Sequence, residues 1–236
     1  MRLPARDAVF PGNRGRAASR VPGRAQSGAA ATDNEAVTIY QLKPRFQALL
    51  RPLARRLHAA RVTANQVTLA ACAVSLMLGV ALCLQPPPAL FLLLPAWLFL
   101  RMGLNAVDGM LAREFGQKSA LGAFLNELTD VVSDATLCLP FAFLPHFGWL
   151  PVALAILLAT LTEMTGTVAV MVGASRRYDG PMGKSDRALV LGALGLAVGL
   201  GLPPAAWQQW LFPALSVLLA LTVVNRVRGA LRELAR

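Results

Sequence analysis

The stretch NAVDGMLAREFGQKSALGAFLNELTDVVSD, residues 105–134, decides the fold of this chain. Three aspartates and two asparagines lie there, inside or against long apolar runs: Asn105, Asp108, Asn126, Asp130 and Asp134. Because an ionised carboxylate is costly to place in hydrocarbon, acids in such runs are candidates for a functional site. If both runs are helical, the i,i+3 pair and the i,i+4,i+8 set each line one helix face.

Two such faces, joined by a short polar segment, predict a cage for a hard divalent cation, because such ions prefer carboxylate and amide oxygens. Gly109, Gly116 and Gly122 keep the neighbouring backbone small where a ligand or a second helix would approach closely. The alternative interpretation is a polar seam that only holds two helices together.

The composition indicates an integral membrane protein. Of the 236 residues, 56% are hydrophobic and only 15% are charged, which is far too apolar for an ordinary soluble domain. The net charge of +11 comes from Lys and Arg clustered at segment ends, as anionic headgroups and membrane topology require. No basic–aromatic interleaving is present for base stacking, so we expect the lipid bilayer as a partner and no nucleic acid.

The chain divides into four regions. Residues 1–35 are basic and nearly devoid of large apolar residues, which predicts disorder, and residues 36–61 predict an amphipathic helix lying in the headgroup layer. Pro44 and Pro52 within it imply a kink or a break. Residues 62–225 predict a domain of six transmembrane helices, followed by a basic cytoplasmic tail at 226–236. The expected spans lie near 65–84, 89–111, 120–145, 151–173, 187–202 and 210–225.

The connectors between these spans sort by charge. Those after the first, third and fifth spans contain no Lys or Arg, whereas both terminal regions and the other connectors contain nearly all of them. By the positive-inside rule both termini and the loops after spans two and four are cytoplasmic. The acidic motif then lies at the cytoplasmic mouth, and we expect the protein in a bacterial inner membrane.

The motif resembles that of the CDP-alcohol phosphotransferases (CDP-alcohol phosphatidyltransferases) of the class-I type, whose signature reads D-x2-D-G-x2-A-R-x8-G-x3-D-x3-D. Every spacing is matched here by Asn105, Asp108, Gly109, Ala112, Arg113, Gly122, Asn126 and Asp130. The first and third acidic positions are Asn in this chain. Together with the helix layout, the resemblance covers roughly residues 40–236.

The resemblance implies transfer of a substituted phosphate from a CDP-linked donor, CDP-diacylglycerol, to an alcohol acceptor, with release of CMP. It implies a homodimer and a Mg²⁺ or Mn²⁺ site lined by Asn105, Asp108, Asn126 and Asp130, with Asp130 also the catalytic base. Around the nucleotide it places Gly109, Ala112, Arg113 and Gly122 from the motif, and Asn65 and Thr68 from the entry to the first span. For the entry residues the alternative is helix capping, by Asn65 or by Thr63.

A second cluster of cations follows the fourth span. The relatives use this loop and its flanking helix ends to bind donor or acceptor phosphates, which here points to Arg176, Arg177, Lys184 and Arg187. Cations at a cytoplasmic rim are also expected from topology alone. Within the spans, Arg101 is expected to pair with an acid, for which Glu163 is a candidate.

Two other functions are compatible with the sequence. The paired Asp-to-Asn departures favour a catalytically silent scaffold or partner subunit that keeps the fold, because each removes one negative charge from a metal site. A small transporter, its path lined by Arg101, Glu163 and the acids, would show inverted repeats, and no convincing internal repeat is found.

Overall fold

The structure is a computed structural model that describes residues 39–236, apart from residues 85 and 204. The predicted disordered segment, residues 1–35, lies outside the described residues. Within them every regular element is a helix, as predicted, and no strand is present. The α-helices are α1 (Ile39–Ala59), α2 (Ala64–Cys83), α3 (Leu93–Glu114), α4 (Ala120–Cys138), α5 (Trp149–Met171), α6 (Lys184–Gly199) and α7 (Leu211–Leu234). Short 3₁₀ helices precede α3 and α7 and follow α4: η1 (Pro88–Leu92), η3 (Ala206–Trp210) and η2 (Leu139–Phe143).

The predicted spans correspond in order to α2 through α7. Among the described residues, four helical stretches are long and apolar enough to cross a membrane: Ala64–Cys83, Pro88–Glu114, Trp149–Met171 and Ala206–Leu234. α4 falls outside this group because it carries Glu127, Asp130 and Asp134, and α6 because it has only 16 residues. Six spans therefore remain a prediction.

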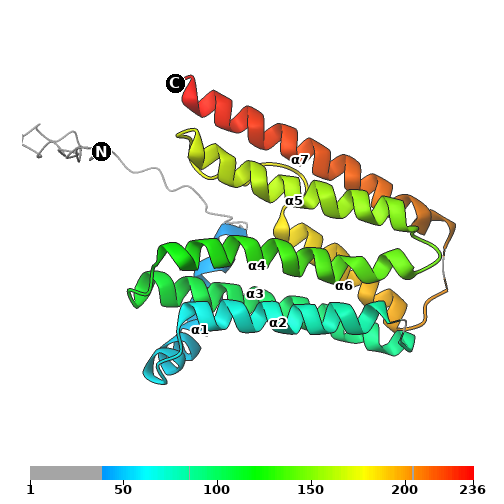
Figure 1. Cartoon of the computed structure of the whole chain (residues 1–236), viewed down its shortest axis with the longest axis horizontal. Helices are drawn as coiled ribbons and strands as arrows, with labels where there is room; N and C mark the ends of the chain where they lie inside the picture. The colour runs from blue at the N-terminus through cyan, green and yellow to red at the C-terminus, as the bar shows by residue number, and fades with distance from the viewer. Residues whose placement is uncertain (1–38, 85, 204) are drawn as a thin grey trace, which may run out of the picture. The chain divides into compact units, whose positions relative to one another are not determined.

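The first helix differs from the rest in direction. α1 packs against α3 and runs across, rather than along, the direction of α2 to α5 (Figure 1). The helix continues through both Pro44 and Pro52, so the break that the sequence allowed is absent. An exposed ion pair connects Arg51 of α1 with Glu114 at the end of α3.

The last helix extends beyond the predicted boundary at residue 225. α7 continues to Leu234, and Ala230 packs with Ala169 and Ala174 in a small buried cluster. This packing explains why much of the predicted tail, residues 226–236, remains helical. Because α7 continues past residue 225, Arg226 lies in the interior, with only 2% of the residue's surface exposed.

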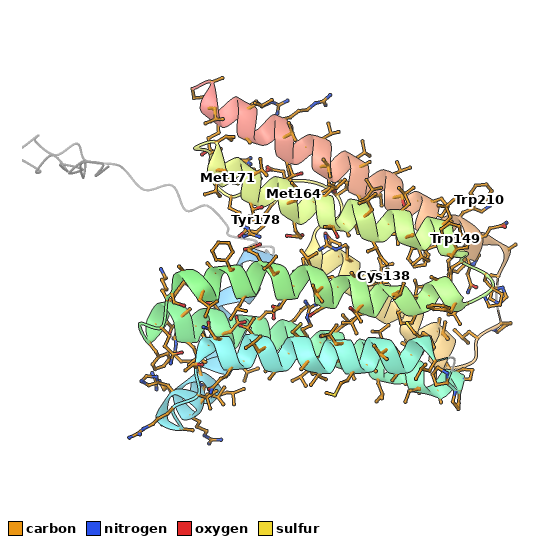
Figure 2. All side chains as sticks on the ribbon, viewed as in Figure 1. Cys138, Trp149, Met164, Met171, Tyr178 and Trp210 are labelled. Carbon is orange, nitrogen blue, oxygen red and sulfur yellow. The ribbon has the colours of Figure 1, made fainter. Side chains whose placement is uncertain are left out.

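The apolar core gathers at the end of the bundle opposite the acidic motif. Phe91, Phe141, Phe147 and Phe212 pack there in edge-to-face and tilted pairs, with the centroids of contacting rings 5.4–6.1 Å apart. Trp149 and Trp210 are exposed at this same end (Figure 2). At the motif end, α3 packs instead against α1 and α2 through a smaller buried cluster that includes Ala54, Val67 and Val107.

Close backbone approach between α2 and α4 depends on Gly79. A Cβ atom at Gly79 would lie 2.5 Å from the carbonyl oxygen of Thr136, a contact that no rotamer change relieves. We predict that Gly79→Ala destabilises the protein by about 1–3 kcal/mol, as expected for overpacking. Gly103→Ala is the matched control, because a Cβ atom at Gly103 of α3 meets nothing within 4 Å. Thermal unfolding in detergent checks this, and equal melting temperatures would contradict the packing.

Candidate functional site

Two asparagines and two aspartates of the acidic motif, Asn105, Asn126, Asp108 and Asp130, meet in one polar cavity of about 510 Å³. Its walls come from α3, α4, α5, the connection between α5 and α6, the start of α6, and the buried face of α7. The predicted site residues that line it are Asn105, Asp108, Gly109, Arg113, Asn126, Asp130, Arg176 and Lys184. The i,i+3 and i,i+4 spacings therefore place these residues on one face of each helix, and the two faces meet at this cavity.

Two residues of α2 support this cavity from outside its lining. Oγ1 of Thr68 donates a hydrogen bond of 2.8 Å to Oδ2 of Asp108, which is 5% exposed. A Cβ atom at Gly122 would lie 2.8 Å from Oδ1 of Asn65, so these two residues are neighbours. The helix cap is made by Thr63, which forms a reciprocal capping box with Gln66.

The remaining residues assigned to the nucleotide are divided between packing and the cavity rim. Ala112 packs against the buried cluster between α1, α2 and α3, and it does not line the cavity. The guanidinium of Arg113 lies close to Gly109, where a Cβ atom would meet its Nη2 at 2.9 Å. Gly109 therefore gives Arg113 its space over the α3 backbone.

Arg177 points to a different cluster from the other predicted cations. Its Nε lies 2.7 Å from Oδ2 of Asp179 and its Nη1 lies 2.8 Å from Oε2 of Glu233. The hydrogen bond from Arg177 holds the pKa of the Asp179 carboxyl below its ordinary value. Glu233 also accepts hydrogen bonds from Ser175, so this cluster ties the α5–α6 connection to the end of α7.

Asp130 is surrounded by donors. Its Oδ1 accepts hydrogen bonds from Nη2 of Arg101 at 3.0 Å and from Nδ2 of Asn105 at 3.2 Å. Its Oδ2 pairs with the ammonium of Lys184, the first residue of α6. The catalytic base implied by the sequence resemblance is thus held in place by α3 and α6.

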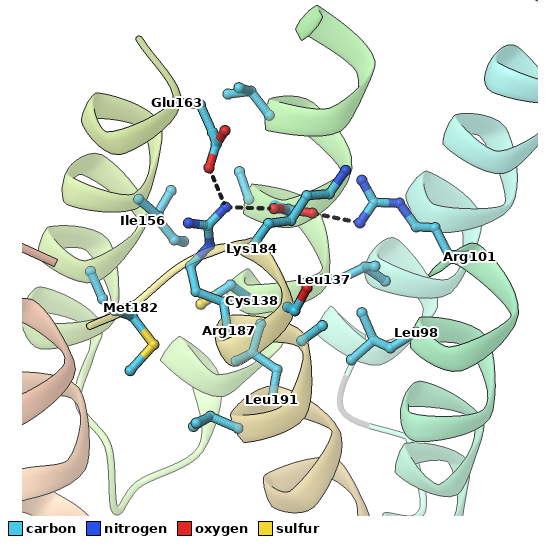
Figure 3. A pocket seen from close by; sticks show the side chains of 18 of the residues that line it. Leu98, Arg101, Leu137, Cys138, Ile156, Glu163, Met182, Lys184, Arg187 and Leu191 are labelled. Atoms are coloured by element: carbon cyan, nitrogen blue, oxygen red, sulfur yellow. Dashed lines mark hydrogen bonds and ion pairs between the residues drawn. The ribbon is translucent and has the colours of Figure 1, made fainter. Parts of the chain in front are cut away.

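A chain of buried ion pairs continues from this carboxylate into the bundle. Asp134 accepts from Nη1 of Arg101 at 2.5 Å and from Nη2 of Arg187 at 3.1 Å, and Arg187 lies 3.0 Å from Oε1 of Glu163 (Figure 3). Arg101 therefore pairs with acids, as expected, but these are Asp130 and Asp134 and not the candidate Glu163. Arg101 is one turn before Asn105 on α3, which directs it to α4 rather than to α5.

Glu163 is instead the acid shared by three arginines. Besides Arg187, Nη1 of Arg226 lies 3.7 Å away and Nη2 of Arg176 lies 3.8 Å away. Arg176 also pairs with Glu127 of α4. This hydrogen bond raises the pKa of the Arg176 guanidinium above its ordinary value. Sequence reasoning missed Arg226 because it was assigned to the tail. Arg226 lies four residues after Thr222, on the same buried face of α7. This spacing is the sequence signal that Arg226 belongs to the helix and is buried.

An apolar chamber of about 330 Å³ adjoins the polar cavity. The two share Asn105, Glu163, Lys184 and Ser185 in their linings. The chamber's other walls are mostly apolar and include Leu98, Leu137, Cys138, Ile156 and Leu191 (Figure 3). A ligand with a charged end and an apolar end would find matching surroundings for both.

The donor set suits a hard divalent cation but is short of charge. Asp108, Asp130, Asn105 and Asn126 all have carboxylate or amide oxygens, which are the ligands that Mg²⁺ and Mn²⁺ prefer. Among the described residues, no group of three or more His, Cys, Asp or Glu side chains is placed to hold a metal ion. The two asparagines of the motif account for this, because they supply neutral amides where carboxylates would stand.

The apolar helices and the oxygen-lined cavity together define an integral membrane protein with a polar site enclosed among its helices. The family model of the CDP-alcohol phosphatidyltransferases matches residues 61–227, and the chain belongs to this family. This confirms the family indicated by the motif.

Relatives and solved structures agree with this assignment. The chain is 50% identical over 195 residues to the inner membrane protein YnbA of Escherichia coli (strain K12), covering 83% of this chain and 97% of YnbA. It is 24% identical over 173 residues to the archaetidylinositol phosphate synthase of Pyrococcus horikoshii, covering 72% of this chain and 90% of that protein. The apolar helices and the likeness to YnbA support an integral inner-membrane location.

The fold is also shared with the phosphatidylinositol phosphate synthase PgsA1 of Mycobacterium tuberculosis. Its complex with manganese and citrate aligns with a TM-score of 0.63 at 20% identity, covering 77% of this chain and 88% of that chain. The structure with CDP-DAG bound aligns with a TM-score of 0.55 at 23% identity, covering 80% and 92%. At these identities the likeness shows the fold.

The buried guanidinium of Arg101 is expected to matter more for stability than any exposed ion pair. Replacing it leaves Asp130 and Asp134 without their shared partner in a low-dielectric interior. We predict that Arg101→Met destabilises the protein by about 3–5 kcal/mol, the cost of breaking a buried pair. Arg51→Met, which removes the exposed pair with Glu114, should change the melting temperature little. Similar losses in the two variants would contradict the role assigned to Arg101.

Proposed function

We propose that this protein is a membrane phosphatidyltransferase that moves a phosphatidyl group from CDP-diacylglycerol to an alcohol acceptor and releases CMP. The observation that carries the proposal is the meeting of the motif's oxygens with Arg176 and Lys184 in one cavity, beside an apolar chamber. The cavity suits the charged pyrophosphate, and the chamber suits part of an acyl chain. PgsA1, which shares the fold, binds CDP-DAG in its solved structure, and this supports the choice of donor.

Asn105, Asp108, Asn126 and Asp130 would hold the Mg²⁺ or Mn²⁺ ion that the family uses. When bound, such an ion neutralises charge on the pyrophosphate and makes CMP a better leaving group. Thr68 would contribute to the metal site indirectly, because its hydrogen bond holds the carboxylate of Asp108 in one orientation.

The chain's own residues supply the other requirements of the transfer. Asp130 accepts the proton of the acceptor hydroxyl as that oxygen forms its bond to phosphorus and the bond from phosphorus to CMP breaks. Arg101 and Asn105 hold the carboxylate in one orientation during this step. Arg176 and Arg226 each have a buried Nε without a hydrogen-bond partner among the described residues, and these donors suit phosphate oxygens.

We assign the nucleotide and the phosphates to different groups of residues. We place the CDP moiety beside Gly109 and Arg113, which line the cavity, with Asn65 and Gly122 adjoining them. Ala112 packs against the buried cluster of α1, α2 and α3 and would support this part of the site from behind. Arg176, Lys184 and Arg187 would face the phosphates of the donor or the acceptor. The engagement of Arg177 with Asp179 and Glu233 makes it a positioning residue for this loop.

The membrane arrangement is part of the proposal. α2 to α7 would each cross the bilayer, with α4 and α6 shielded by their neighbours, and α1 would lie in the cytoplasmic headgroup layer. Both termini and the cavity then face the cytoplasm, where the nucleotide and a soluble acceptor are found. We further propose a homodimer, as the family resemblance implies.

One observation favours a second candidate, a catalytically silent partner subunit. The motif has two neutral amides, and its carboxylate Asp130 is already paired with Arg101 and Lys184. A site so compensated binds divalent ions more weakly than one with four carboxylates. The decisive experiment mixes purified protein, CDP-diacylglycerol and a panel of alcohols with Mg²⁺ or Mn²⁺ and measures CMP. Metal-dependent release of CMP supports the enzyme, and no release with any acceptor supports the silent subunit.

Asp130 distinguishes the two candidates at one residue. We predict that Asp130→Asn lowers turnover by roughly 10²–10⁴-fold, the usual loss for a positioned base, while expression is retained. Glu114→Gln is the matched control, because Glu114 pairs with Arg51 outside the cavity and should keep wild-type rates. Wild-type turnover in Asp130→Asn would rule out Asp130 as the base and favour Asp134 or Glu127.

A further inference from the structure

Both oxygens of the Asp130 carboxylate already have partners from the protein. Oδ1 accepts from Arg101 and Asn105, and Oδ2 pairs with Nζ of Lys184. Arg101 also donates to the backbone carbonyl of Asp130 at 3.2 Å, which fixes the guanidinium against α4. The negative charge of Asp130 is therefore compensated before any ligand arrives.

Asp108 is in a different electrostatic state. It is buried, its Oδ2 accepts a neutral hydrogen bond from Thr68, and no Arg or Lys forms an ion pair with it in the described part of the chain. A buried carboxylate without a compensating charge is costly unless a cation binds it. The motif thus contains one carboxylate that lacks a counter-charge and one that has two.

We propose that the ammonium of Lys184 is a built-in counter-cation of Asp130, and that the site consequently holds a single divalent ion, bound through Asp108. This inference rests on the proposed function. Asp108 and Asp130 together carry two negative charges, and Lys184 and Arg101 already pair with one of these carboxylates. Two divalent ions would bring four positive charges to that site, and their repulsion at close range would be largely uncompensated.

The position of Lys184 is built into the fold. Lys184 is the first residue of α6, and the preceding Gly183 donates its backbone N–H to Oδ2 of Asp186 at 2.8 Å. This cap fixes the start of α6 beside α4, so the ammonium reaches Asp130 from a half-exposed position on the cavity wall. Lys118, exposed in the connection between α3 and α4, pairs with no acid among the described residues and offers a matched control.

The test measures Mn²⁺ binding to the purified full-length protein, by calorimetry and by electron paramagnetic resonance. The wild type, Lys184→Arg and Lys118→Met should each bind one ion and give the spectrum of an isolated Mn²⁺. Lys184→Met should bind a second ion and show spin coupling between the two. Its first ion should bind more tightly by a factor on the order of ten or more, because one close positive charge is gone.

Other outcomes separate this inference from the proposed function. Two ions in the wild type would overturn the role of Lys184 and leave the enzyme proposal standing. Identical binding by Lys184→Met and Lys118→Met would do the same. No bound ion in any variant would contradict the metal site itself, and with it both proposals. If Lys184→Met does not fold, the wild-type stoichiometry alone decides.

Discussion

The salt bridge of Arg101 with Asp130 and Asp134 is the interaction on which the rest of the structure depends. Arg101 is 4% exposed, and a guanidinium placed so deeply is tolerated only when carboxylates meet it with good geometry. The pairs continue through Arg187 to Glu163, so α3, α4, α6 and α5 are fixed relative to one another by charge. These ion pairs therefore determine where the motif oxygens lie relative to one another.

The same network gives a physical meaning to an asparagine in the motif. Asn105 donates a hydrogen bond to Asp130, which an aspartate in that place could not do without a proton. A carboxylate there would stand 3.2 Å from another and repel it. The amide therefore removes one metal-ligand charge and at the same time stabilises the carboxylate to which we assign the transferred proton.

The helix faces and the motif's meeting point were predictable from sequence, because i,i+3 and i,i+4 spacings determine which side chains share a face. The partners across helices were not predictable in the same way. Arg101 was expected to pair with an acid, with Glu163 as a candidate, and it pairs with Asp130 and Asp134 instead. Periodicity gives the direction of a side chain but not the rotation of the facing helix. Arg226 was missed because the last helix was expected to end with the apolar run at residue 225, whereas α7 continues to Leu234.

The central claim is that one cavity, held in shape by buried ion pairs, binds a divalent ion through the motif oxygens. Anomalous diffraction from crystals grown with Mn²⁺ tests it most directly. The account predicts an anomalous peak at the cavity oxygens of Asp108 and the neighbouring motif residues, with the Arg101 pairs intact. Ordered cavity side chains without any anomalous peak among them would contradict it.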